Sequence, residues 1–164
     1  MREIARQLGA RLRETGRTIS VAESCTAGGL AHEITRVPGA SAYFLGGVIA
    51  YDDAVKISLL DIPRSDLQRF GAVSAETAEA MATACRSLFG TDTAVSITGI
   101  AGPGGGTDEK PVGLVFIAVA GERGVRCHRF EFPGNRDDVR AQAIDAALKE
   151  SLNLLDETGE AVRA

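Results

Sequence analysis

Several residue types are scarce in this chain of 164 residues, and each scarcity narrows the kind of protein it can be. There is no tryptophan, and there are only two tyrosines, two histidines and three cysteines. Cys25, Cys85 and Cys127 are odd in number and form no Cys-x-x-Cys pair, which gives no support to a zinc knuckle or a redox dithiol. A secreted protein would more often carry an even set, so we expect a cytoplasmic protein.

Long apolar runs and an excess of basic charge are also missing. The longest apolar run, 113–121, has about nine residues, whereas a membrane-spanning helix needs about 20. The first residues are charged and contain no apolar signal core. A net charge of −4 argues against a protein that binds duplex nucleic acid, although a few local arginines can still attract a small anion. We therefore expect a soluble protein with neither a membrane nor a nucleic acid as partner.

The remaining composition, 45% apolar and 24% charged, is that of a globular domain that folds without a disulfide or metal staple. Asp52, Ser74 and Asn135 are expected helix N-caps. Helices must cover a buried sheet, and the 121–124 turn makes one strand pair antiparallel. We expect a single domain over 1–164. Its predicted class is α/β, a three-layer α/β/α sandwich with a mixed, mostly buried sheet. The expected helices are 2–15, 26–36, 52–60, 63–69, one after Ser74, and 135–155; the expected strands are 18–22, 47–51, 93–98, 112–120 and 125–132, followed by a frayed tail at 156–164.

Glycine is the residue in surplus, and its distribution is uneven. The 19 glycines make up about 12% of the chain, against a usual share near 7%. About half of them fall in or beside three segments that also carry reactive side chains. We interpret this surplus as backbone cleared for a ligand. The glycines concerned are Gly28, Gly29, Gly46, Gly47, Gly99, Gly102, Gly104, Gly105, Gly106 and Gly113.

The first of these segments is Ala-Glu-Ser-Cys-Thr-Ala-Gly at 22–28, where a predicted strand meets a predicted helix. Such a corner exposes its turn residues and directs helix N–H groups at a ligand. Ser24 is a candidate nucleophile there, and the amides of Cys25 and Thr26 are candidates to hold an oxyanion. A serine at a helix start is more often an N-cap, and the Gly-x-Ser-x-Gly elbow is absent, so both interpretations stay open.

The second segment, Tyr-Asp-Asp-Ala-Val-Lys at 51–56, follows the end of a predicted strand. A serine hydroxyl needs a base before it attacks an amide, and His32 and His128 lie on a predicted helix and strand rather than at a loop. A lysine can act as the base where burial favours its neutral form. Lys56 is therefore the candidate base, and Tyr51 could pass or share the proton. The alternative is a solvated helix lysine beside a half-buried strand tyrosine.

The third segment is a glycine-rich loop between two strands, within 98–113. It fits neither the P-loop nor the dinucleotide fingerprint, but its backbone N–H groups can wrap around a ligand. Gly99, Gly102 and Gly104 are the candidate binding residues, and a flexible hairpin connection is the alternative.

The fourth segment, Gly-Asn-Arg-Asp-Asp-Val-Arg-Ala-Gln at 134–142, opens the last helix. Arg136 and Arg140 lie one turn apart near the N-terminus of this helix, where a phosphate is attracted both by the helix end and by the guanidinium groups. The alternative is a helix start stabilised by Asp–Arg salt bridges.

Together these segments resemble the C-terminal domain of the competence/damage-inducible protein CinA and its stand-alone relatives, the nicotinamide-mononucleotide (NMN) amidohydrolases. The resemblance covers about residues 4–155. The motifs that carry it are Ala-Glu-Ser-Cys-Thr at 22–26, Tyr51 with Lys56, Gly-Ala-Val-Ser at 71–74, Gly-Ile-Ala-Gly-Pro at 99–103, Glu-Lys-Pro-Val-Gly at 109–113, and Gly-Asn-Arg with Val-Arg-x-Gln at 134–142.

The resemblance implies hydrolysis of the NMN carboxamide to nicotinate mononucleotide and ammonia, with no metal or other cofactor. Ser24 would be the nucleophile, assisted by Tyr51 and Lys56. Our interpretation of the last helix adds Arg136, Arg140 and Gln142 as ligands for the phosphate or ribose. The partner would be a small nucleotide, and the apolar helix faces also allow a homodimer.

The sequence departs from the family at two places. Ala27 stands where many members have glycine, and Gly46-Gly47 replaces the more usual Arg-Gly. The missing arginine is expected to weaken phosphate binding.

Two other functions stay open at this stage. One is a related amidase that uses Cys25 as its nucleophile, together with Glu23 and Lys56. The other is a non-catalytic nucleotide-binding or regulatory module that has the pocket without turnover.

Overall fold

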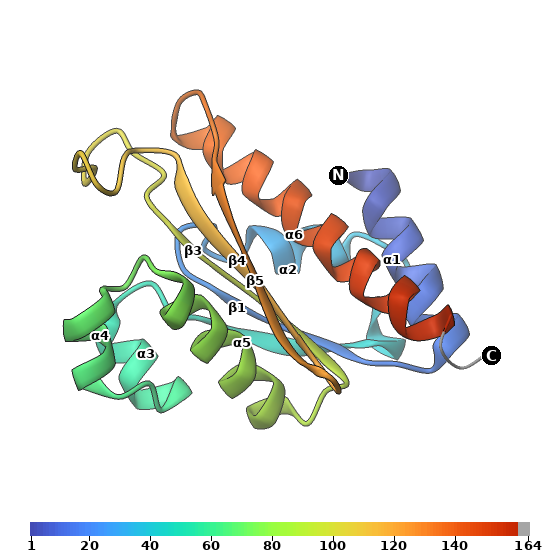
Figure 1. Cartoon of the computed structure of the whole chain (residues 1–164). Coiled ribbons are helices and arrows are strands. Elements are labelled where there is room, and N and C mark those ends of the chain that lie inside the picture. The colour runs from blue at the N-terminus through green and yellow to red at the C-terminus, as the bar shows by residue number, and fades with distance from the viewer. Residues whose placement is uncertain (161–164) are drawn as a thin grey trace.

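Five strands form one mixed sheet, and helices cover both of its faces (Figure 1). The computed structural model describes residues 1–160, of which 158–160 are described by their backbone only. In chain order the elements are α1 (Arg2–Thr15), β1 (Ile19–Glu23), α2 (Gly29–Thr35), the short 3-10 helix η1 (Ala40–Ala42), β2 (Phe44–Ile49), α3 (Asp53–Leu60), α4 (Arg64–Phe70), α5 (Ala75–Phe89), β3 (Thr93–Gly99), β4 (Leu114–Gly121), β5 (Gly124–Glu131) and α6 (Arg136–Glu160).

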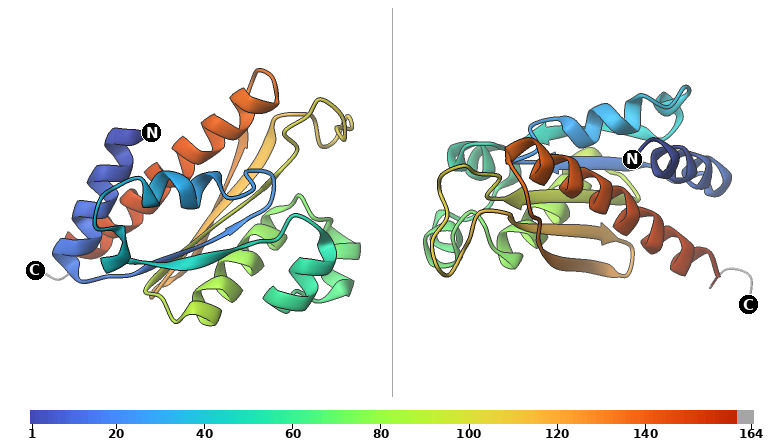
Figure 2. Two further views of the ribbon diagram at one scale, coloured as in Figure 1. Left: turned by 180° about the vertical axis from the view of Figure 1, so that it is seen from behind. Right: turned by 90° about the horizontal axis from the view of Figure 1, so that it is seen from above.

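The three layers are seen from two further directions in Figure 2. Helices α1, α2 and α6 cover one face of the sheet, and α5 covers the other, with α3 and α4 packed against α5. The interior strands β1, β3 and β4 are buried on both faces; β4 is almost continuously apolar, whereas β1 and β3 also carry buried polar side chains. The predicted three-layer α/β/α sandwich with a mixed sheet is confirmed.

The strand order, β2-β1-β3-β4-β5, determines where a ligand can bind. Strands β2 and β3 both pair parallel with β1, whereas β3–β4 and β4–β5 are antiparallel. The chain passes from β1 to β2 on one side and then returns to place β3 on the other side of β1. Ligands of open α/β sheets bind outside the carboxyl ends of the strands at such a switch point. The segments that follow β1, β2 and β3 meet at this edge.

The predicted helix caps are confirmed. The Asp52 side chain accepts a hydrogen bond from the Ala54 amide, and Ser74 Oγ accepts one from the Thr77 amide. Asn135 Oδ1 accepts from the amides of the second and third residues of α6. These caps bond within three residues along the chain, which is why the sequence alone reveals them.

Three element boundaries differ from the prediction. Helix α2 begins at Gly29 rather than at 26, because 24–28 forms a separate turn. Strand β2 covers 44–49 rather than 47–51, because its register with β1 begins at the Ile19–Phe44 pair. The expected fraying from 156 is wrong as far as 160, where α6 is still helical, and residues 161–164 lie outside the described part. Within the described residues, no helix combines the length and apolarity needed to span a membrane.

Candidate active site

A cavity of about 280 Å³ lies beyond the carboxyl ends of β1, β2 and β3. It is enclosed by the corner after β1, the segment after β2, the glycine-rich loop after β3, the loop before α5 and the first residue of α6. The residues that line it are Ser24, Cys25, Tyr51, Asp53, Lys56, Ala72, Val73, Thr98, Gly99, Ile100, Ala101, Gly102, Gly104, Gly105 and Arg136.

Ser24 is held at this corner by its backbone and keeps its hydroxyl free. Its amide donates to Ile97 O of β3 at 2.9 Å, which fixes the corner against the sheet. Among residues 1–160 the Ser24 hydroxyl has no hydrogen-bond partner, and Gly28, not Ser24, is the N-cap of α2. The interpretation of Ser24 as a helix cap is therefore wrong, and its hydroxyl is available to a ligand in the cavity.

Glu23 performs the capping that the serine does not. Its carboxylate is buried and accepts hydrogen bonds from the amides of Gly28 at 3.1 Å, Leu30 at 3.0 Å and Ala31 at 2.8 Å. The first amides of α2 are thus committed to Glu23 and are not directed at the cavity. The role of Glu23 was missed in the sequence, where it was considered only as a partner of Cys25.

The remaining amides of the corner are those of Cys25 and Thr26. In the described part of the chain neither donates to a carbonyl oxygen, so they stay candidates for an oxyanion site. The Cys25 thiol is 6% exposed, and burial raises its pKa to about 11. Because the thiolate is the nucleophilic form of cysteine, this environment disfavours Cys25 as the nucleophile at neutral pH.

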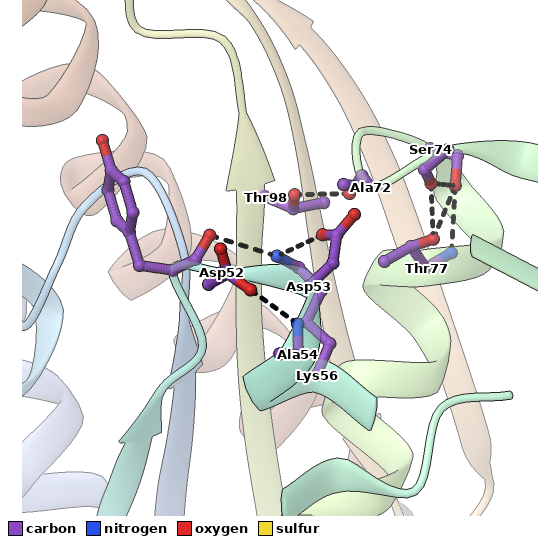
Figure 3. A network of polar contacts seen from close by, with 10 residues as sticks. Asp52, Asp53, Ala54, Lys56, Ala72, Ser74, Thr77 and Thr98 are labelled. Carbon is purple, nitrogen blue, oxygen red and sulfur yellow. Dashed lines mark hydrogen bonds and ion pairs between the residues drawn. The ribbon is translucent and has the colours of Figure 1, made fainter. Parts of the chain in front are cut away.

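Lys56 is a buried amine rather than a solvated helix lysine. Its side chain is 1% exposed, and Nζ lies 3.2 Å from Asp53 Oδ1 and 3.4 Å from the carbonyl oxygen of Tyr51 (Figure 3). Helix α3 places these groups together, because residues three apart share one face of a helix. The amine lines the same cavity as the Ser24 hydroxyl.

Tyr51 contacts Lys56 through its main chain and points its hydroxyl elsewhere. The residue follows β2 instead of lying within it, and it is 56% exposed, so the half-buried strand position is wrong. Its Oη accepts a hydrogen bond from Arg136 Nη2 at 2.9 Å. Arg136 Nη1 donates to Gly102 O at 2.8 Å. The start of α6 is thereby joined to two walls of the cavity.

The glycine-rich loop is anchored at its base. Ile100 donates its amide to Leu114 O, and Gly113 donates its amide to Ile100 O, both at 2.8 Å. A Cβ at Gly99 would lie 2.7 Å from Leu114 O, so the close approach of these two strands requires glycine there. The base of the loop is therefore ordered by the β3–β4 ladder, and the interpretation as a merely flexible connection does not hold there.

A second segment, 70–73, forms another wall of the cavity, and side chains from outside it donate hydrogen bonds to its carbonyl oxygens. Lys110 Nζ donates to Phe70 O at 2.9 Å and to Val73 O at 2.7 Å. Thr98 Oγ1 donates to Ala72 O at 2.7 Å (Figure 3). This arrangement gives a physical reason for two of the motifs. Gly-Ala-Val-Ser forms this wall of the cavity, and Glu-Lys-Pro supplies the lysine that holds the wall in place.

Three predicted site residues lie outside the cavity. Thr26 is fully buried below the corner, and its carbonyl oxygen accepts from Arg140 Nη2 at 2.9 Å. Gln142 Nε2 donates to Pro133 O and Asp138 O and so supports the start of α6. Arg140 and Gln142 therefore do not line the cavity, whereas Arg136 does.

Sequence reasoning missed several residues of the wall. Asp53 lies in the same motif as Lys56, and its spacing of three was the available signal. Thr98 ends β3, but nothing local to it points to the loop that it holds. Ala72 and Val73 are apolar and were noted only as part of a motif, so their place at the cavity had no chemical signal.

The two departures from the family pattern, at positions 27 and 46, lie in different surroundings. Ala27 has φ +50°, in the left-handed region that favours glycine. Gly46 lies within β2 against Phe89, where a Cβ would be 2.9 Å from that ring, and it does not line the cavity. The expected weakening of phosphate binding by the missing arginine stays a prediction. Within residues 1–160, no three His, Cys, Asp or Glu side chains gather as a metal site would require.

Comparison with known proteins agrees with this architecture. Residues 1–155 match the family model of the CinA C-terminal domain. A "CinA-like protein" of Geotalea uraniireducens is 50% identical over 146 residues, covering 87% of this chain and 35% of the relative. A "Putative competence-damage inducible protein" of Desulforudis audaxviator is 51% identical over 142 residues, covering 87% of this chain and 34% of the relative. The chain thus spans about a third of the length of these relatives.

Solved structures of similar proteins have the same fold. The competence/damage inducible protein from Agrobacterium tumefaciens superposes with a TM-score of 0.91 at 38% identity, covering 94% of each chain. A CinA superfamily protein from Klebsiella pneumoniae superposes with a TM-score of 0.92 at 31% identity, covering 95% of this chain and 98% of that one. The match over almost the whole chain, in sequence and in fold, shows that this protein belongs to the CinA C-terminal domain family.

Proposed function

We propose that this protein hydrolyses the carboxamide of NMN, giving nicotinate mononucleotide and ammonia, with Ser24 as the nucleophile. The observation that carries the proposal is that Ser24, whose hydroxyl has no partner among the described residues, and the buried Lys56 line one cavity. A nucleophile and a base at a single concave site are the minimum that acyl transfer requires. The family resemblance adds the substrate, and the cavity adds room for the carboxamide end of such a molecule.

The first step is the attack on the carboxamide. Lys56 in its neutral form takes the proton of Ser24 Oγ, and Oγ forms a bond to the carboxamide carbon. The carbonyl oxygen then carries a negative charge, for which the amides of Cys25 and Thr26 are the nearest uncommitted donors of the corner. Glu23 serves this step indirectly, because it holds the turn that presents those amides.

The second step releases ammonia. The C–N bond breaks, the nitrogen takes the proton from the Lys56 ammonium, and an ester of Ser24 remains. Water then attacks the ester carbon after losing a proton to Lys56, and the proton returns to Ser24 Oγ as the acid leaves. One water is consumed and one ammonia is formed, and Ser24 and Lys56 regain their initial states.

The test is ammonia release from NMN, compared with nicotinamide, nicotinamide riboside and NAD. Ser24→Ala is expected to lower kcat by at least about 10³-fold, because removing the nucleophile of a serine hydrolase costs at least this much. Ser65→Ala, an exposed serine on α4, is the control and should retain full activity. Wild-type turnover in Ser24→Ala would refute the nucleophile. Saturable NMN binding without ammonia release would instead indicate a non-catalytic nucleotide-binding module.

A further inference from the structure

Arg136 joins the tyrosine of the site to its glycine-rich loop. Its Nη2 donates to Tyr51 Oη at 2.9 Å, and its Nη1 donates to Gly102 O at 2.8 Å. Both terminal nitrogens of the guanidinium thus have a protein acceptor, and the acceptors come from segments 51 residues apart in the sequence. Two of the five N–H donors of Arg136 therefore hold parts of the protein together.

The chemistry of these two groups fixes the direction of the tyrosine proton. A guanidinium donates hydrogen bonds and accepts none, so Tyr51 Oη must be the acceptor in this contact. The O–H hydrogen of Tyr51 therefore points away from Arg136 and is free to donate to another group. Because Tyr51 lines the cavity and is 56% exposed, a bound ligand or solvent water can accept this hydrogen bond.

We propose that Arg136 is a positioning residue: it orients the Tyr51 hydroxyl as a donor toward the reacting carboxamide and holds the glycine-rich loop in place, instead of binding the substrate phosphate. This inference rests on the proposed function, which it deepens by giving Tyr51 its orientation. These contacts use two of the five N–H groups of the guanidinium, so the experiments must separate positioning of Tyr51 from contact of the remaining N–H groups with a phosphate.

Kinetics with two substrates separate the two roles. For Arg136→Met and Arg136→Lys we expect kcat for NMN to fall at least about 10-fold, with KM changed less than about 3-fold. Nicotinamide riboside, which has no phosphate, should lose kcat by the same factor wherever it is turned over. A phosphate ligand would behave differently: Arg136→Met would raise KM for NMN alone, and Arg136→Lys would largely restore it, since lysine also binds phosphate.

A double-mutant cycle tests whether Arg136 acts through Tyr51. Residues that act through one contact lose activity non-additively. Arg136→Met combined with Tyr51→Phe should therefore have a kcat within about 3-fold of the slower single variant. Losses that multiply in the double variant would overturn the coupling. Arg123→Met, on the exposed β4–β5 turn, is the matched control for loss of one positive charge.

The scarcity of aromatic residues provides a test that needs no activity. The chain has two tyrosines and no tryptophan, and Tyr43 is 1% exposed whereas Tyr51 is 56% exposed. In NMR spectra of protein with isotope-labelled tyrosine, Arg136→Met should shift the Tyr51 ring signals and leave those of Tyr43 unchanged. Titration of the wild type with inorganic phosphate should move neither set. Movement of the Tyr51 signals toward their positions in Arg136→Met would show that phosphate takes Arg136 from Tyr51, and would overturn the proposal.

Ammonia release and the Tyr51 NMR signals test the proposed function and the positioning role separately. A wild-type protein that releases no ammonia from NMN refutes the proposed function, and the tyrosine signals then decide alone whether Arg136 holds Tyr51. Unchanged Tyr51 signals in a folded Arg136→Met variant refute the positioning role even where NMN is hydrolysed. Thermal unfolding of each variant, compared with the wild type, identifies a variant that has lost its fold, in which case Arg136→Lys is the variant used.

Discussion

Glu23→Gln is the substitution whose effect the structure determines most directly. Glu23 ends β1, is 1% exposed and accepts three amide hydrogen bonds from the turn and first residues of α2. Oε2 accepts two of these bonds and Oε1 accepts the third. Glutamine has nearly the same shape but presents an NH₂ group in place of one oxygen, and that group donates and does not accept.

The magnitude follows from this count. If the amide oxygen of glutamine takes the place of Oε2, the Ala31 amide loses its acceptor and faces the NH₂ group instead. Leaving one partly buried amide unpaired costs about 1–3 kcal/mol. The two remaining bonds change from a charged to a neutral acceptor and weaken by roughly half, about 1 kcal/mol each, while the lower desolvation of the neutral side chain offsets part of this loss. The free energy of unfolding should therefore fall by about 2–4 kcal/mol, and Tm by roughly 5–15 °C.

Urea unfolding followed by far-UV circular dichroism measures this change, since the chain has no tryptophan to report it by fluorescence. Glu33→Gln is the matched control. Glu33 is also a buried glutamate, on α2, but its side chain accepts a hydrogen bond from the Arg36 guanidinium at 2.7 Å, which glutamine can still contact through its oxygen. We expect a loss of at most about 1 kcal/mol for this control. Equal stability of the two variants would refute the role of Glu23 as the cap of the serine corner.

Three further substitutions test other parts of the site. Cys25→Ser should keep NMN hydrolysis, and loss of activity in this variant would restore Cys25 as a candidate nucleophile. Alkylation of Cys25 in the wild type should be slow near neutral pH and accelerate toward pH about 11, because burial raises the pKa of the thiol to that value. Lys110→Met should lower both kcat and the free energy of unfolding, the latter by about 2–4 kcal/mol, because it leaves two half-buried carbonyl oxygens without their charged donor. Lys149→Met removes an ion pair of an exposed lysine and should lose less than about 1 kcal/mol. Ala27→Gly should raise stability by up to about 1 kcal/mol by relieving φ +50°, and a lower Tm in that variant would contradict the strain.

The parts of the fold that could be predicted are those determined by neighbours along the chain. Asp52 and Ser74 bond to amides two or three residues away, so their identity and position suffice to reveal them. Strand β2 was misplaced by three residues because it is an edge strand whose boundary is set by pairing with β1, not by its own sequence. Glu23 was missed for a similar reason: a buried carboxylate looks anomalous in a strand until the turn that it caps is folded back over it.

The location of the site could be predicted, but the contacts within it could not. The motifs at 22–26, 51–56 and 98–105 each follow a strand, and parallel strands bring their carboxyl ends to one edge. Nothing local indicates that Lys56 meets the carbonyl of Tyr51 while the hydroxyl of Tyr51 meets Arg136. That division of one tyrosine between a lysine and an arginine depends on where α3 and α6 dock, and docking is a property of the whole core.

Helix α6 shows which of these contacts helical geometry could have predicted from the sequence. Arg136 has the spacing of the stripe Val139, Ala143 and Ala147, all fully buried, so helical geometry places it on the face that packs toward the sheet. Gln142 lies off that stripe and bonds back to the start of its own helix. Arg140 shares the inner side but lies one turn, about 6 Å, further along the axis, and it therefore reaches Thr26 behind the serine corner instead of the cavity. Chemical type alone made the two arginines and the glutamine equivalent as phosphate ligands; their angular and axial positions on α6 separate them.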